Sequence, residues 1–178
     1  VLSLAACGVF VALSFGLSKA AAQQIVRSDA AAADRTVDLI LNPRPGNALC
    51  WDALRLTREA DTMRAERAVV ALPAGAPTCG GEAPLAWTTV ASLSIPELAR
   101  LSAQNCSVRA WLQFGRAPSI EEGLIGDLRF SQSVRGGDFT AMRIDESAGG
   151  TCPPYLTNWV PPRSDLLGDG AGGASLAQ

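Results

Sequence analysis

The 178-residue sequence contains no histidine, and its charged residues amount to only 18% of the chain. Without an imidazole it lacks the usual metal ligand, the usual base that activates a serine or cysteine nucleophile, and the usual proton carrier near neutral pH. The formal net charge of −2 argues against the basic surface of a nucleic-acid-binding protein, so we expect no nucleic-acid partner. There is also no G-x-S-x-G, P-loop or dinucleotide-binding pattern, which disfavours a self-contained enzyme. We therefore expect no catalytic residue and no metal ligand in this chain.

Hydrophobic residues make up 48% of the sequence, which excludes a disordered chain, and they are concentrated at the start. Residues 1–18 include no charge. As a helix they would span about 27 Å, close to the ~30 Å core of a bilayer. We favour a transmembrane helix, with the lipid bilayer as its partner. The open alternatives are a signal peptide with small residues at 20–22, a lipoprotein signal around Cys7, and a buried helix of a soluble protein.

The alanine- and glutamine-rich segment 20–35 predicts that this helix continues as a juxtamembrane stalk. Ser28 and Asp29 could interrupt it, because both residues favour helix ends over helix interiors. We expect three parts: a transmembrane helix and stalk over 1–35, an extramembrane β-rich domain over 36–167, and a flexible tail over 168–178. The predicted fold class is α+β, in which the N-terminal transmembrane helix precedes a small, mostly antiparallel sheet with one short helix.

Within the second part, Ser94 and Glu97 form a capping box around Pro96 and predict a helix that ends near Gln104. Two neighbouring apolar segments around the polar turn 59–61 predict a hairpin, with a helix as the competitor over 57–68. The segment 73–84 reads as a loop rich in proline and glycine. The predicted strands are 49–57, 63–72, 107–114, 124–130 and 139–144.

Four cysteines outside the apolar segment, Cys50, Cys79, Cys106 and Cys152, are candidates for disulfides. Four cysteines allow three pairings, and the sequence does not choose among them. We favour Cys79–Cys106 with Cys50–Cys152, and buried free thiols are the alternative. If the disulfides form, the residues after 36 face an oxidising, periplasm-like space.

Three smaller patterns bear on a site. Asp127 and Arg129 share one face of a predicted strand and are placed to pair. Glu121 and Glu122 point to opposite faces, so they do not form one acidic site and read as a solvated loop. The four tryptophans are predicted to pack in the core, with a ligand cleft as the alternative. Pro161 and Pro162 suggest a strap across the sheet.

Several short motifs resemble the C-terminal half of the LexA-binding, inner-membrane-associated family of predicted metal-dependent hydrolases. They are the proline-containing segment 42–51, Ala-Trp-Leu-Gln-Phe at 110–114, Gly-Asp-Leu-Arg-Phe at 126–130, Cys-Pro at 152–153, Trp-Val-Pro-Pro-Arg at 159–163 and Asp-Leu-Leu at 165–167. The matching residues, which we interpret as structural, are Asn47, Trp51, Trp111, Asp127, Arg129, Trp159, Pro161, Pro162 and Arg163.

The resemblance implies a bacterial inner-membrane protein whose residues after 36 are periplasmic. It also implies a divalent metal bound by histidines of the family's multi-helix N-terminal half, which would be this chain's upstream partner. No catalytic residue and no cofactor carries over to the chain itself. The expected function is thus a structural or substrate-facing C-terminal region of such a hydrolase. The alternative is an independent, disulfide-stabilised binding module in the periplasm or on a membrane anchor.

Overall fold

The computed structural model describes residues 2–29, 32, 34–72, 79, 85–131, 133–136 and 139–144. These residues belong to two compact units. The first unit comprises Val1–Thr57 with Glu66–Thr89, and the second comprises Arg58–Ala65 with Val90–Gln178. The expected tail over 168–178 lies outside the described residues.

The first unit begins with one long helix, α1 (Leu2–Ser28). It continues past the apolar segment and ends where Ser28 and Asp29 were expected to interrupt it. The transmembrane prediction is wrong, because none of the described helices is both long enough and apolar enough to cross a bilayer. The inner-membrane location, which rested on that helix, is overturned with it.

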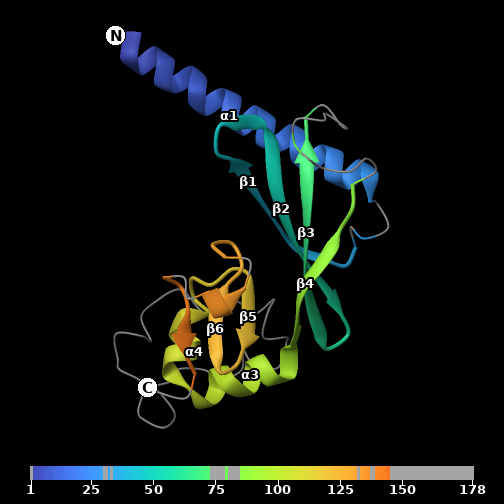
Figure 1. Ribbon diagram of the computed structural model, residues 1–178, viewed down its shortest axis with the longest axis vertical. Coiled ribbons are helices and arrows are strands. Elements are labelled where there is room, and N and C mark those ends of the chain that lie inside the picture. Colours follow the sequence, from blue (N-terminus) through green and yellow to red (C-terminus); the bar gives the residue numbers. More distant parts are fainter. Residues whose placement is uncertain are drawn as a thin grey trace, which may run out of the picture. The chain divides into compact units, whose positions relative to one another are not determined.

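The second half of α1 packs against the first sheet instead (Figure 1). Ala21 and Ile25 are buried in one hydrophobic cluster with Trp51, Ala53 and Val70 of the sheet. The first half of α1 leaves its large apolar side chains exposed, and Phe15 keeps 74% of its surface accessible. The sheet, rather than a bilayer, is therefore the partner of the C-terminal half of this helix.

That sheet has four strands in the order β1-β2-β3-β4, namely β1 (Thr36–Arg44), β2 (Asn47–Glu59), β3 (Thr62–Ala71) and β4 (Thr88–Ser94). The predicted hairpin is confirmed as β2 and β3, which meet at a turn where Ala60 has a φ of 50°. Strand β1, which contains Pro43, was not predicted. It tolerates this proline at the edge of the sheet, where it pairs antiparallel with β2 alone.

The predicted helix is confirmed as α3 (Ile95–Gln104), with Ser94 as its N-cap, because the backbone N–H of Glu97 donates to Ser94 Oγ at 3.4 Å. The Glu97 carboxylate binds Arg100. The predicted strand over 107–114 is wrong, because α4 (Cys106–Trp111) occupies most of it. Asn105 explains the error: its Oδ1 accepts from the backbone N–H groups of Ser107 and Val108 and so starts a second helix. After β4, the described residues therefore form two short helices rather than the single one predicted.

The second sheet has the order β5-β6-β7 and antiparallel pairing, with β5 (Pro118–Glu121), β6 (Leu124–Asp127) and β7 (Met142–Arg143). Glu121 ends β5, so it is not in a loop as expected, whereas Glu122 lies in the following turn with a φ of 51°. The predicted strands 124–130 and 139–144 are both shorter than expected. A 3₁₀ turn, η2 (Val134–Gly136), precedes β7. The α+β class and the antiparallel pairing agree with the prediction.

Candidate functional site

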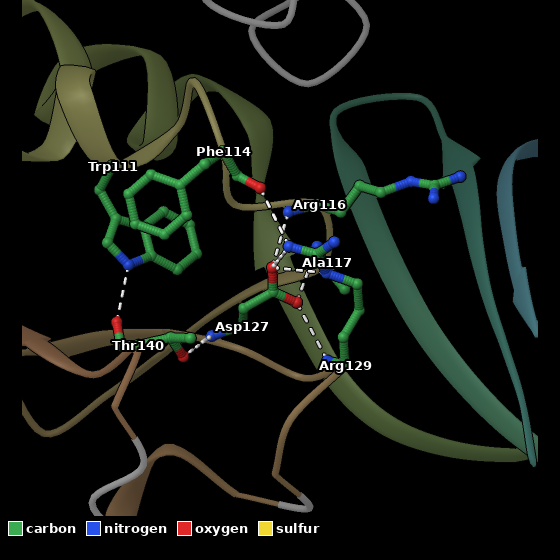
Figure 2. Close-up of polar contacts among 7 residues, drawn as sticks. All are labelled: Trp111, Phe114, Arg116, Ala117, Asp127, Arg129 and Thr140. Atoms are coloured by element: carbon green, nitrogen blue, oxygen red, sulfur yellow. Dashed lines mark hydrogen bonds and ion pairs between the residues drawn. The ribbon is translucent and has the colours of Figure 1, made fainter. Parts of the chain in front are cut away.

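The second unit is organised around the carboxylate of Asp127, the last residue of β6, which is fully buried. Its Oδ2 accepts from the backbone N–H of Arg116 at 2.8 Å and from Nε and Nη2 of Arg129 at 2.9 and 2.7 Å. Its Oδ1 accepts from the backbone N–H groups of Ala117 and Arg129 at 3.3 and 3.0 Å. Five donors thus surround the two oxygens, as Figure 2 shows.

Thr140 connects Asp127 to Trp111, the last residue of α4. The backbone N–H of Asp127 donates to Thr140 Oγ1 at 3.0 Å, and the indole Nε1 of Trp111 donates to the Thr140 carbonyl at 2.7 Å (Figure 2). Gly115 lies against the indole, because a Cβ at that position would come within 2.1 Å of Cζ3 of Trp111. The cluster therefore joins the end of α4 to one end of the second sheet, where β6 ends and β7 begins.

The predicted pairing of Asp127 with Arg129 is confirmed, and Trp111 is packed in the core as expected. The structure also brings Trp111 close to Asp127, although the sequence placed them in separate motifs. Sequence reasoning missed Thr140, since a lone threonine in a glycine-rich segment gives no signal of its own. It also missed that backbone N–H groups, rather than side chains, supply most partners of Oδ1.

The other matched residues lie in the first unit or outside the described residues. Asn47 starts β2, where its Oδ1 accepts from the backbone N–H of Leu49 at 3.1 Å. Trp51 is buried in the core, as predicted. Trp87 is only half-buried and contacts Arg55. Trp159, Pro161, Pro162 and Arg163 lie outside the described residues, and so does the expected strap.

The structure pairs Cys50 with Cys79, so both favoured pairings, Cys79–Cys106 and Cys50–Cys152, are wrong. The two sulfurs are buried beside Ala71, where the end of β3 approaches β2. Cys106 is also disulfide-bonded, and Cys152 lies outside the described residues. The pairing depends on the fold, because the segment that carries Cys79 returns to β2, the strand that holds Cys50. The spacing of the cysteines along the chain does not reveal this return.

Arg44 stabilises the region around the Cys50–Cys79 disulfide. Its Nε and Nη2 donate to Asp52 Oδ1 at 2.9 and 2.8 Å, and its Nη1 donates to the carbonyl of Cys79 at 3.0 Å. One side chain at the end of β1 thus binds both β2 and the segment that carries Cys79.

A second arginine, Arg55 of β2, binds two carboxylates at once. Its Nε and Nη2 lie 3.0 and 2.9 Å from Glu66 Oε2, and its Nη1 lies 2.5 Å from Asp29 Oδ2. Its guanidinium carbon stands 4.1 Å from the centre of the Trp87 ring. The charge is buried, with 7% of the side chain exposed, and it is neutralised by residues from α1 and β3.

These groups do not suit a divalent metal. Among the described residues, no three histidine, cysteine, aspartate or glutamate side chains gather where they could ligate an ion. Asp127, the most buried carboxylate, has both oxygens occupied by N–H donors, whereas a metal ligand needs free lone pairs directed at the ion. What this arrangement can do is hold three turns of the chain in fixed positions around a neutralised carboxylate.

The chain was also compared with known proteins. No family model, curated protein or solved structure matches it.

Proposed function

We propose that this chain is a non-catalytic region that presents a binding surface, and that it forms the C-terminal part of a larger protein of the hydrolase family it resembles. The observation that carries the proposal is the saturation of Asp127. A general base needs a lone pair that can accept a proton from a substrate, and a nucleophile needs access to one. With five donors on two buried oxygens, this carboxylate does neither and serves to position the turns around it.

The cluster also supports the resemblance. Trp111 belongs to one motif and Asp127 with Arg129 to another, and these three residues meet through Thr140 and Phe114. If these residues are needed for hydrogen bonds within the fold, that structural role accounts for the shared motifs, and no catalytic role is required. The alternative, an independent disulfide-stabilised binding module, is supported by the same cluster and by the Cys50–Cys79 bond.

The substitution Asp127→Asn tests the structural role. An amide at this position keeps one acceptor oxygen and directs an N–H₂ group at neighbouring donors, so we expect a loss of about 3 kcal/mol or more in unfolding free energy. Chemical denaturation followed by tryptophan fluorescence measures it. Glu122→Gln, at an exposed turn position, is the matched control and is expected to change stability by less than about 0.5 kcal/mol.

Catalysis is tested on the intact chain with nitrophenyl phosphate and ester substrates in the presence of magnesium, manganese or zinc ions. We expect no turnover above that of the buffer. Metal-dependent turnover that Asp127→Asn abolishes in a protein that is still folded would contradict the proposal. The reading frame upstream of Val1 distinguishes the two forms of the proposal, a region of a larger protein and an independent module. A histidine-containing region there supports the larger protein, and a start codon within a few codons supports the independent module.

A further inference from the structure

Three phenylalanines of the second unit are exposed on neighbouring turns. Phe114 follows α4, Phe130 follows β6 and Phe139 precedes β7, and they keep 51%, 50% and 84% of their surfaces accessible. The rings of Phe130 and Phe139 lie 4.8 Å apart between centroids. Arg129 connects the backbone of Phe114 to this pair, because its Nη2 donates to the Phe114 carbonyl at 3.0 Å and its guanidinium lies 4.9 Å from the Phe130 ring. The Phe114 ring itself packs against Trp111, with centroids 5.5 Å apart. We call Phe114, Arg129, Phe130 and Phe139 the phenylalanine surface.

Two of the three guanidinium nitrogens of Arg129 bind other groups of the chain. Its Nε and Nη2 bind Asp127, and Nη2 also donates to Phe114. Within the part of the chain that the structure describes, its Nη1 has no partner, and the side chain is 22% exposed. Because Asp127 is fully buried beneath the guanidinium, the charge that this cluster presents to solvent is positive.

Arg55 has the same surroundings as Arg129, with one more partner. In both arginines, Nε and Nη2 bind one carboxylate and an aromatic ring lies close to the guanidinium. At Arg55 the remaining Nη1 binds a second carboxylate, that of Asp29. At Arg129, none of the described residues fills the equivalent position, and the exposed ring of Phe130 lies beside the guanidinium.

We propose that the phenylalanine surface binds a peptide of a partner protein in which an aspartate or glutamate stands next to a large apolar residue. The carboxylate binds Nη1 of Arg129, as Asp29 binds Nη1 of Arg55, and the apolar side chain packs on the rings of Phe130 and Phe139. This inference rests on the proposed binding function and names its partner class.

The chemistry favours a peptide over a small molecule. Small ligands are bound in concave sites that bury most of their surface, whereas these rings lie on turns and stay at least half exposed. An open surface with aromatic rings around an arginine has the composition of a protein–protein contact, where such residues dominate the binding energy. Charge complementarity selects a carboxylate, because its hydrogen bond to a guanidinium is charge-assisted.

The test uses the intact, nitrogen-15-labelled chain and the peptide acetyl-Gly-Asp-Phe-Leu-Gly-amide, titrated by NMR. We expect saturable shifts of the Arg129 side-chain Nε–H and of the backbone amides of Phe130 and Phe139. The matched peptide has asparagine in place of aspartate and loses the charge-assisted hydrogen bond. We expect its affinity to be lower by about tenfold or by a larger factor. Equal affinity for the two peptides would overturn the proposal, as would the absence of saturable shifts at millimolar peptide.

Two variants with the same substitution locate the site. Phe139→Ala removes an exposed ring that does not contact the Asp127 carboxylate, and we expect it to weaken peptide binding about fivefold or more. Phe15→Ala removes an equally exposed ring on α1 and is expected to leave the affinity unchanged. If Phe15→Ala weakens binding as much as Phe139→Ala does, the peptide binds by unspecific apolar contact and the proposal fails.

The chain's own Asp165-Leu166-Leu167 has the proposed chemistry and is a competing occupant. If Asp165→Asn strengthens binding of the peptide, the surface is occupied from within the chain and a partner protein is not its ligand. Unchanged binding supports the partner. Failure of this inference is distinct from failure of the proposed function, which is recognised by metal-dependent turnover and not by peptide affinity.

Discussion

Nη1 of Arg55 lies 2.5 Å from Oδ2 of Asp29, so an ion pair fastens the end of α1 to the middle of β2. Asp29 directly follows the helix, and Arg55 also binds Glu66 on β3. Through one buried guanidinium, three segments distant in sequence are held together beside the hydrophobic contacts of Ala21 and Ile25. The docked half of the helix is therefore fixed by charge as well as by apolar burial.

Replacing Arg55 with leucine leaves Asp29 and Glu66 partly buried without their cation. We expect the unfolding free energy to fall by about 2–4 kcal/mol, somewhat less than for a fully buried pair because both carboxylates keep some solvent access. Urea denaturation measures it. Arg64→Leu is the control, since Arg64 is half exposed and its ion pair with Glu59 is 3.2 Å long. A loss as large at Arg64 as at Arg55 would show that burial of the pair is not the cause.

Removal of the Cys50–Cys79 disulfide destabilises the protein mainly because it increases the conformational entropy of the unfolded chain. The bond closes a loop with a sequence separation of 29 residues, so the double variant Cys50→Ala with Cys79→Ala should lose about 3–4 kcal/mol. Denaturation without added reductant measures the loss. The single variant Arg44→Gln, which removes a brace on the Cys79 carbonyl but keeps the bond, is expected to lose only about 1 kcal/mol. Similar losses in the two proteins would contradict the chain-entropy explanation.

Two glycine substitutions distinguish a packed position from an open one. Gly115→Ala places a methyl group against the Trp111 indole, which cannot move without breaking its bond to Thr140, so we expect a loss of about 2–3 kcal/mol. Gly16→Ala meets no atom within 4 Å in α1, and alanine is the better helix former by up to about 1 kcal/mol. Thermal unfolding should therefore shift in opposite directions, and a shift of the same sign would refute this account.

Acid should weaken the first turn of α3. The hydrogen bond from Arg100 lowers the pKa of the Glu97 carboxyl below its ordinary value of 4.5. The ionised pair thus contributes stability that is complete above the ordinary pKa and is lost as the pH falls through the lowered one. An NMR titration of the Glu97 side-chain carboxyl measures this pKa, and Arg100→Gln should raise it towards the ordinary value. No change in that variant would mean that Arg100 is not the cause.

Local chemistry made parts of this fold predictable. The Ser94–Glu97 capping box identified α3, and the polar turn between two apolar segments identified the β2–β3 hairpin. Ser28 and Asp29 were recognised as residues that could interrupt the helix, and α1 ends there, although the stalk was predicted to continue to residue 35. Each of these signals acts within a few residues, through a cap or a turn, and so can be recognised in a short window. The pairing of Asp127 with Arg129 belongs to the same class, since the two residues are only two apart.

Other features were mispredicted because their causes are distant in sequence. The alternating pattern at 107–114 suggested a strand, but the bond from Trp111 to Thr140, 29 residues away, favours the helix α4. The cap from Asn105 is local and was overlooked. The apolar segment of α1 suggested a bilayer, but Trp51 and Val70 of the sheet cover its second half.

The sequence alone determined the absence of histidine chemistry, the positions of the short-range caps and turns, and the mixed α+β composition. Only the tertiary structure decided which cysteines pair, that backbone and guanidinium donors saturate Asp127, and that Arg55 and Arg129 share one arrangement in which Nη1 of Arg129 has no partner among the described residues. The physical reason is that hydrogen bonds and ion pairs to a buried group depend on where distant backbone segments meet, and no short window of sequence carries that information.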